Sequence, residues 1–191
     1  MAGALLYSAR YAVQAPPPVD EVAPGEMEQP LALEVATHPD FSLPDVNGTE
    51  HDFSEWAGRN RIVNFWATWC APCRREIPML KAFQDEQGGN GFQVIGIAVD
   101  FPEPVANYAA EAAFNYPILV GEKDAMAVAE SSGIEFVGLP FTMFVASDGE
   151  LLGAFIGELH QSHLDTVVDV MTRLDRAEIS KKDAQATFSV L

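Results

Sequence analysis

Runs of apolar residues mark the centre of this chain as a buried sheet. Residues 61–67 and 92–99 carry apolar side chains at nearly every position, which is typical of strands that are covered on both faces. Shorter apolar runs follow at residues 117–120, 141–146 and 151–156. Together these runs predict the strands of one sheet.

Segments between and after these strands have the spacing of helices. In the first, Ile77, Leu80 and Phe83 recur at helical intervals before a pair of glycines ends the pattern. In the last, Leu164, Val167, Val168 and Met171 lie on one helix face. The predicted helices are residues 70–87, 105–114, 124–131 and 159–174.

Turn signals complete the predicted architecture. Asn47-Gly48 separates two short alternating runs within residues 41–53, and Asp148-Gly149 separates the last two predicted strands. Both pairs are typical of β-hairpins. Residues 54–58 predict a short helical turn. The order of strands, helices and hairpins predicts an α/β fold with a mixed sheet and flanking helices.

The two ends of the chain are less domain-like than its middle. Residues 1–15 are small and apolar with a lone Arg10, and both a membrane-anchor or signal remnant and a disordered terminus remain open. Prolines and acidic residues then predict an extended linker up to residue 32. We expect one folded domain over residues 33–177 and a flexible tail over residues 178–191.

Composition excludes several classes of function. The chain has 191 residues and a formal net charge of −17, so it repels nucleic acid and anionic membrane surfaces. Its two cysteines are too few for a multi-disulfide scaffold or a four-cysteine zinc site. The sequence has neither a glycine-rich phosphate loop nor a dinucleotide fingerprint, so we expect no organic cofactor.

The candidate chemistry lies at Cys70-Ala71-Pro72-Cys73, directly after the first buried strand. A helix that begins here offers unpaired N–H groups and a positive dipole end, which favour a thiolate on Cys70. Pro72 fits the first turn, where its missing N–H is not required. Cys73 would be shielded one turn deeper. The motif predicts a reversible disulfide, with Cys70 as the attacking thiol and Cys73 as the resolving thiol.

Other interpretations of the motif are weaker. A haem-attachment site needs a histidine where Arg74 stands. A structural disulfide across so few residues would stabilise little. A metal site would need further ligands, and the candidates are His38, His51, His160 and His163. Nothing in the sequence brings these to the cysteines, and His160 and His163 fit a helix cap or a solvated face better, so we expect no metal.

Residues 63–78, which read V-N-F-W-A-T-W-C-A-P-C-R-R-E-I-P, resemble the active-site segment of the thioredoxin-like TlpA/ResA family in the redoxin superfamily. The resemblance extends over residues 41–174. It implies a thioredoxin-like fold with an amino-terminal hairpin and a central helix–strand insertion at residues 105–133. It also implies a thiol–disulfide oxidoreductase that is tethered to the bacterial inner membrane and faces the periplasm.

The resemblance also implies roles for individual residues. Pro140 corresponds to the family's cis-proline facing the dithiol, and the backbone of Leu139 would pair with a bound substrate segment. Leu139 is larger than the threonine or valine often found there, which affects the choice of partner. Trp69 would form an apolar rim for partner peptides, and Ala71 and Pro72 would line the same substrate-binding region.

Glu76 is a further catalytic candidate by this resemblance. It lies three residues after Cys73, which places the two on one helix face, and it could move protons to or from Cys73 at neutral pH if burial raises its pKa. The alternative is a solvated helix acid. Asn64 stands where cytosolic thioredoxins carry a buried aspartate, and an asparagine cannot titrate.

The resemblance implies that the protein reduces disulfides in partner proteins, of the apocytochrome c or copper-site class, and is itself re-reduced by a membrane thiol donor. Nucleic acid is not an expected partner. A disulfide-donating oxidant would use the same motif, and only the reduction potential would distinguish it. A peroxide reductase and a copper-binding chaperone are weaker alternatives, because the Cys-x-x-Cys helix start is the wrong setting for the former and a chaperone needs a histidine beside both thiolates.

Overall fold

The computed structural model describes residues 41–133 and 136–191. The strands are β1 (Ser42–Pro44), β2 (Glu50–Asp52), β3 (Asn60–Trp66), β4 (Phe92–Ala98), β5 (Ile118–Val120), β6 (Phe141–Val145) and β7 (Leu151–Ile156). The helices are η1 (Phe53–Trp56), α1 (Ala71–Gln87), η2 (Gly88–Asn90), α2 (Pro102–Ala112), α3 (Lys123–Ser131), α4 (Gln161–Asp175) and α5 (Lys181–Phe188). The predicted anchor or signal remnant and linker at residues 1–32 lie outside the described residues.

Five strands form a mixed sheet in the order β5-β4-β3-β6-β7. β3, β4 and β5 run parallel, while β6 is antiparallel to β3 and β7 is antiparallel to β6. The central strands β3 and β4 are buried at every position, as their continuous apolar runs predict. The predicted α/β fold with a mixed sheet is therefore confirmed.

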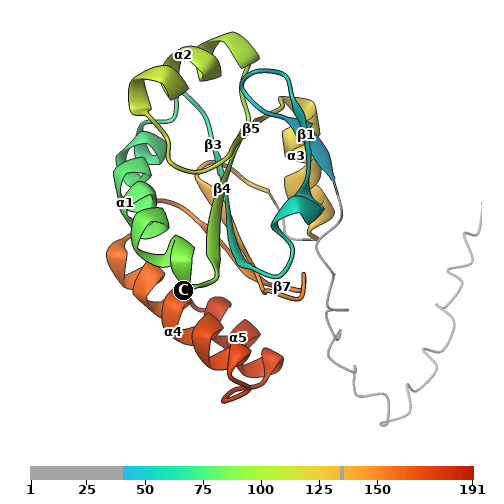
Figure 1. The fold of residues 1–191 in the computed structure, drawn as a ribbon, viewed down its shortest axis with the longest axis vertical. Coiled ribbons are helices and arrows are strands. Elements are labelled where there is room, and N and C mark those ends of the chain that lie inside the picture. The colour runs from blue at the N-terminus through green and yellow to red at the C-terminus, as the bar shows by residue number, and fades with distance from the viewer. Residues whose placement is uncertain (1–40, 134–135) are drawn as a thin grey trace, which may run out of the picture. The chain divides into compact units, whose positions relative to one another are not determined.

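Helices cover both faces of this sheet (Figure 1). On one face, Ile62 and Trp66 of β3 join a core with residues of α1, α4 and α5. On the other face, Val63 and Phe65 join a core with α3 and the β1–β2 hairpin. Alternate residues of β3 thus point to opposite faces. This alternation decides which side chains of β3 meet α1.

Both predicted hairpins are present. β1 and β2 pair antiparallel across the turn that contains Gly48, and β6 and β7 pair across the turn that contains Gly149. Each of these glycines has a positive φ, 82° at Gly48 and 97° at Gly149, a conformation that residues with a side chain rarely adopt. The β1–β2 hairpin also bridges to β5 through Asp45 and Leu119.

The predicted flexible tail at residues 178–191 is wrong. Helix α5 occupies most of this segment, and Ser180 caps it by accepting a hydrogen bond from the N–H of Asp183 at 3.2 Å. Phe188 is fully buried and stacks on Phe144 of β6 with ring centroids 4.9 Å apart. The burial of this aromatic ring, together with Ala184, holds the segment against the sheet.

Among residues 41–133 and 136–191, none of the helices combines the length and the apolar character needed to cross a membrane.

Candidate active site

Cys70 and Cys73 are joined by a disulfide at the amino-terminus of α1, with an S–S distance of 2.01 Å. Cys70 is the N-cap residue, and its Sγ accepts a hydrogen bond from the N–H of Cys73 at 3.3 Å. Cys73 is fully buried, whereas Cys70 retains 5% exposure. Cys70 is therefore the sulfur that a second protein can reach, and a thiolate there would face a backbone donor.

The loop that carries Cys70 is held by a buried carboxylate on the neighbouring strand. β3 and β4 are parallel, with Trp66 opposite Ala98, so the loops after them leave the same edge of the sheet. Asp100 accepts hydrogen bonds there from the N–H of Thr68 at 3.0 Å and from its hydroxyl at 2.5 Å. These bonds fix the backbone two residues before Cys70.

Glu76 is buried in α1 on the face that meets β3, with 2% exposure. Its Oε1 accepts a hydrogen bond from Asn64 Nδ2 at 2.8 Å, and its Oε2 accepts one from the N–H of Leu159 at 2.6 Å. Asn64 also donates to Thr142 Oγ1 at 2.9 Å. Glu76 is therefore an interior carboxyl with fixed partners, and the alternative of a solvated helix acid is wrong.

Burial shifts the protonation of Glu76 strongly. Loss of solvent raises the pKa of this carboxyl from 4.5 to about 7, although the hydrogen bonds from Leu159 and Asn64 act in the opposite direction. The nearby charge of Glu158 adds a smaller upward contribution. A carboxyl with a pKa near neutrality can both accept and release a proton at physiological pH.

The peptide bond between Leu139 and Pro140 is cis, as the sequence resemblance predicts. Pro140 is buried and lies immediately before β6. Because β6 is antiparallel to β3 with Phe141 opposite Phe65, Pro140 stands at the edge of the sheet where β3 ends and Cys70 follows. Pro140 and the cysteines therefore occupy the same edge of the sheet.

The predicted substrate-binding residues surround this edge. Trp69 and Ala71 are exposed, and Pro72 and Leu139 are half-buried. Leu139 packs against both core clusters with part of its side chain. The structure thus brings Trp69, Ala71 and Pro72 to the surface beside Cys70, while their contact with a partner remains a prediction.

Of the four candidate histidines, His38 lies outside the described residues, and His51 lies in β2 with its Nδ1 2.9 Å from Glu55 Oε2. His160 precedes α4, and its N–H donates to His163 Nδ1 at 3.1 Å. The rings of His163 and Phe155 lie with their centroids 4.5 Å apart, and burial lowers the pKa of His163. This pair serves as a helix cap. Within the described part of the chain, His, Cys, Asp and Glu do not gather in groups of three or more that could hold a metal ion.

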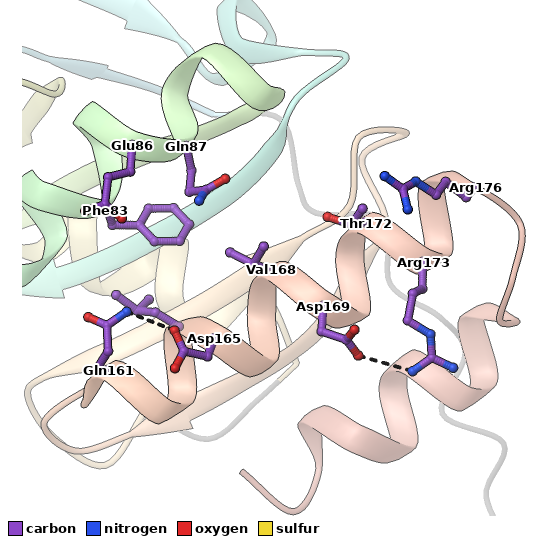
Figure 2. A pocket seen from close by; sticks show the side chains of 11 residues that line it. Phe83, Glu86, Gln87, Gln161, Asp165, Val168, Asp169, Thr172, Arg173 and Arg176 are labelled. Carbon is purple, nitrogen blue, oxygen red and sulfur yellow. Dashed lines mark hydrogen bonds and ion pairs between the residues drawn. The ribbon is translucent and has the colours of Figure 1, made fainter.

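A pocket of about 410 Å³ lies between α1 and α4 (Figure 2). Four of its polar side chains form two pairs, with Gln161 donating to Asp165 at 2.9 Å and Arg173 donating to Asp169 at 3.1 Å. Phe83 lines it from the carboxyl-terminal half of α1, roughly 20 Å along the helix from Cys70 at 1.5 Å per residue. This pocket is not part of the cysteine site.

Sequence reasoning missed two contributors to the site. Asp100 received no role, although a polar residue directly after a buried parallel strand is a signal for a site at the carboxyl edge of a sheet. For Asn64 the sequence indicates only that the position cannot titrate, yet its side-chain amide donates a hydrogen bond to the carboxyl of Glu76. Neither contact can be read from spacing along the chain, because each joins different elements.

Comparison with known proteins identifies the family. The family model described as Redoxin matches residues 35–170. The chain belongs to the Redoxin family. Its Redoxin domain includes the cysteines, the buried Glu76 and the cis-proline.

Individual relatives agree with this assignment. The chain is 30% identical over 137 residues to the thiol-disulfide oxidoreductase ResA of Geobacillus kaustophilus, covering 69% of this chain and 76% of the relative. It is 26% identical over 138 residues to the thioredoxin-like protein YneN of Bacillus subtilis, with 69% and 76% coverage. A crystal structure of a thiol:disulfide interchange protein of the thioredoxin family from Chlorobium tepidum matches with 28% identity and a TM-score of 0.64, covering 71% of this chain and 94% of that chain.

These matches and the Cys70–Cys73 pair establish the activity at a coarse level. The protein is a thiol–disulfide oxidoreductase of the ResA type with a thioredoxin-like fold.

Proposed function

We propose that this enzyme reduces disulfides in partner proteins, with Cys70 attacking the partner and Cys73 resolving the mixed disulfide. The observation that carries the proposal is the burial of Glu76 on the same helix face as the fully buried Cys73. This arrangement supplies a proton acceptor for Cys73 and disfavours a stable thiolate there.

The first step is thiol–disulfide exchange on the partner. The Cys70 thiolate attacks one sulfur of the partner disulfide, the partner's S–S bond breaks, and the released partner thiolate takes up a proton. A mixed disulfide then joins Cys70 to the partner. The N–H of Cys73, 3.3 Å from Cys70 Sγ in the oxidised protein, stabilises the attacking thiolate.

The second step releases the partner. The Cys73 thiol loses its proton to the Glu76 carboxylate, and the Cys73 thiolate attacks Cys70 Sγ. The mixed disulfide breaks, the second partner sulfur leaves as a thiolate and is protonated, and Cys70–Cys73 is oxidised. Two electrons have passed from the enzyme to the partner. Glu76 then gives its proton to solvent or to Cys73 at the next reduction.

The surroundings of Cys73 favour the reducing direction. A dithiol pair becomes a strong oxidant when its reduced form is stabilised. Here Cys73 is fully buried, so a Cys73 thiolate would be desolvated, and the carboxylate of Glu76 would oppose it. The N–H of Cys73 donates to Cys70 Sγ, so this backbone donor favours a thiolate on Cys70 and not on Cys73. We therefore expect a low reduction potential.

The setting of the reaction follows from the same proposal. We place the enzyme on the periplasmic face of a bacterial inner membrane, with residues 1–32 as anchor or signal remnant and linker. A membrane thiol donor would re-reduce Cys70–Cys73, because the periplasm is oxidising. Apocytochrome c and copper-site proteins are the proposed partners, on the strength of the resemblance to the TlpA/ResA family.

The deciding experiment is a redox titration of Cys70–Cys73 in thiol–disulfide buffers, followed by the fluorescence of Trp66 and Trp69. A potential near the value of about −270 mV for thioredoxin is expected for a reductant. A potential near about −120 mV would identify a disulfide-donating oxidant and overturn the proposal.

A further inference from the structure

Three loops at the cysteine edge of the sheet each expose a large apolar side chain. Trp69 is 70% exposed, Phe101 59% and Val137 63%. They lie in the loop after β3, the loop after β4 and the segment before the cis-proline. The parallel pairing of β3 with β4 and the antiparallel pairing with β6 bring these loops to one edge. Apolar side chains gathered at one edge mark a protein-binding surface.

Asp100 ties the first two loops together. Its Oδ2 accepts the two hydrogen bonds from Thr68, and its Oδ1 accepts one from the N–H of Phe101 at 2.8 Å. Trp69 follows Thr68 and Phe101 follows Asp100, so the two exposed rings extend from neighbouring, hydrogen-bonded residues. Because Asp100 is buried, the pair of loops is fixed before a partner arrives, which lowers the ordering cost of binding.

We propose that Trp69, Phe101 and Val137 form a docking surface for the segment around a partner's reacting cysteine. The segment that fits it carries bulky apolar side chains directly beside that cysteine and lysine or arginine farther out. This inference rests on the proposed reduction of partner disulfides, and it adds the chemistry by which a partner segment is selected. Phe101 lies outside the Cys70–Cys73 motif, and we assign it as the residue of this surface that determines which partner segments are preferred.

The position of Cys70 explains why the partner segment should carry apolar side chains beside its cysteine. Its side chain is only 5% exposed, so a partner sulfur must approach closely to react. Consecutive Cα atoms are 3.8 Å apart, so the residues beside the partner's cysteine come close to the loops that carry Trp69 and Phe101. Covering exposed aromatic rings with apolar side chains is favourable.

The charge of the molecule explains why the partner segment should carry lysine or arginine farther from its cysteine. The chain carries a net charge of −17, and the exposed Glu103 follows Phe101 closely. Arg75, in the first turns of α1, is bound by Glu158 through hydrogen bonds of 3.0 and 3.1 Å, which offsets its charge. The net charge therefore attracts a cationic partner segment from a distance.

The test measures how fast the reduced full-length protein reduces three disulfides: glutathione disulfide, and the disulfide-linked dimers of two short peptides. Both peptides have a central cysteine and terminal lysines, and they carry either leucine or serine on each side of the cysteine. The test variant is Phe101→Ala. The control variant is Val190→Ala, which also removes an exposed apolar side chain but lies away from this edge of the sheet.

Wild-type protein and Val190→Ala should reduce the leucine peptide about tenfold faster than the serine peptide. Phe101→Ala should lose most of this preference, with each peptide rate taken relative to the same variant's rate with glutathione disulfide. Equal rates for the two peptides in wild type, or an unchanged preference in Phe101→Ala, would overturn the docking surface. A wild-type protein that reduces none of the three disulfides would overturn the proposed function and this inference with it.

Discussion

Glu76 is a carboxyl whose proton the folded protein holds more tightly than the unfolded chain does. Its pKa is about 7 in the folded state against 4.5 when exposed. Below pH 4.5 both states are protonated, and the folded state keeps its full advantage. As pH rises to 7 and beyond, the unfolded chain ionises first and the folded state loses stability relative to it.

The resulting prediction concerns stability. Wild-type protein should lose roughly 3 kcal/mol of unfolding free energy between pH 4.5 and pH 8 relative to Glu76→Gln, which has no proton to lose. Urea unfolding of the oxidised forms across this range measures the difference. Parallel pH dependences in the two proteins would show that Glu76 ionises normally.

A second prediction concerns the reactivity of Cys73. In a Cys70→Ser background, the alkylation rate of Cys73 should show an inflection near pH 7 that Glu76→Gln removes, because the neighbouring carboxyl changes charge there. Iodoacetamide kinetics over the range of pH measure this profile. Glu103→Gln, which removes an exposed acid on α2, is the matched control and should leave the profile unchanged. A profile that Glu76→Gln does not alter would exclude the proton-transfer role.

At the scale of elements, α5 completes the core on the α1 face of the sheet. Phe188 stacks on Phe144 of β6, and a side chain at Gly153 of β7 would come within 2.7 Å of the Phe188 Cβ. The glycine therefore provides the close approach that lets Phe188 pack against β7 and stack on Phe144.

This packing predicts the effect of removing the ring. Phe188→Ala should destabilise the protein by about 3 kcal/mol, because it removes a fully buried aromatic ring. The reduction potential of Cys70–Cys73 should not change. Denaturant unfolding and redox titration measure the two quantities. Val190→Ala, at an exposed position, should change stability by less than about 0.5 kcal/mol, and an equally small effect of Phe188→Ala would contradict the packing.

The same elements show what a sequence can and cannot reveal. β3 and β4 could be predicted because every residue in them is buried, which leaves an unbroken apolar run. α5 was missed because its contact with the core depends on Ala184 and Phe188 alone, too few for a visible period. The available signal was its start, where Ser180 and Asp183 have the spacing of a helix cap.

The site divides in the same way. Cys70 and Cys73 are close in sequence, so their redox chemistry can be predicted from the motif alone. Helix periodicity places Glu76 on the same helix face as Cys73. The bonds from Asn64 to Glu76 and from Thr68 to Asp100 join different elements. Predicting them requires knowing that β3 packs under α1 and runs parallel to β4, which the residue pattern alone does not specify.

At the scale of the whole molecule, the net charge of −17 sets how partners arrive. The field of such a protein accelerates encounters with cationic partners, and salt screens it with a Debye length of about 10 Å at 0.1 M. The second-order rate constant for reduction of a lysine-flanked peptide disulfide should therefore fall as the salt concentration rises. The rate constant for a glutamate-flanked peptide disulfide should rise with salt, because screening weakens its repulsion from the protein. Stopped-flow kinetics at several salt concentrations measure both trends, and two salt-independent rates would contradict electrostatic attraction.

The hydrogen bond from the Leu159 N–H to Glu76, at 2.6 Å, gives the protein a built-in spectroscopic reporter. The Leu159 amide lies 86 positions along the chain from Cys73, yet it donates to the carboxyl that shares a helix face with that cysteine. Its proton resonance responds to the charge of its acceptor. A backbone nuclear magnetic resonance spectrum of the unmodified enzyme can therefore follow the protonation of the active site at a residue that takes no part in the reaction.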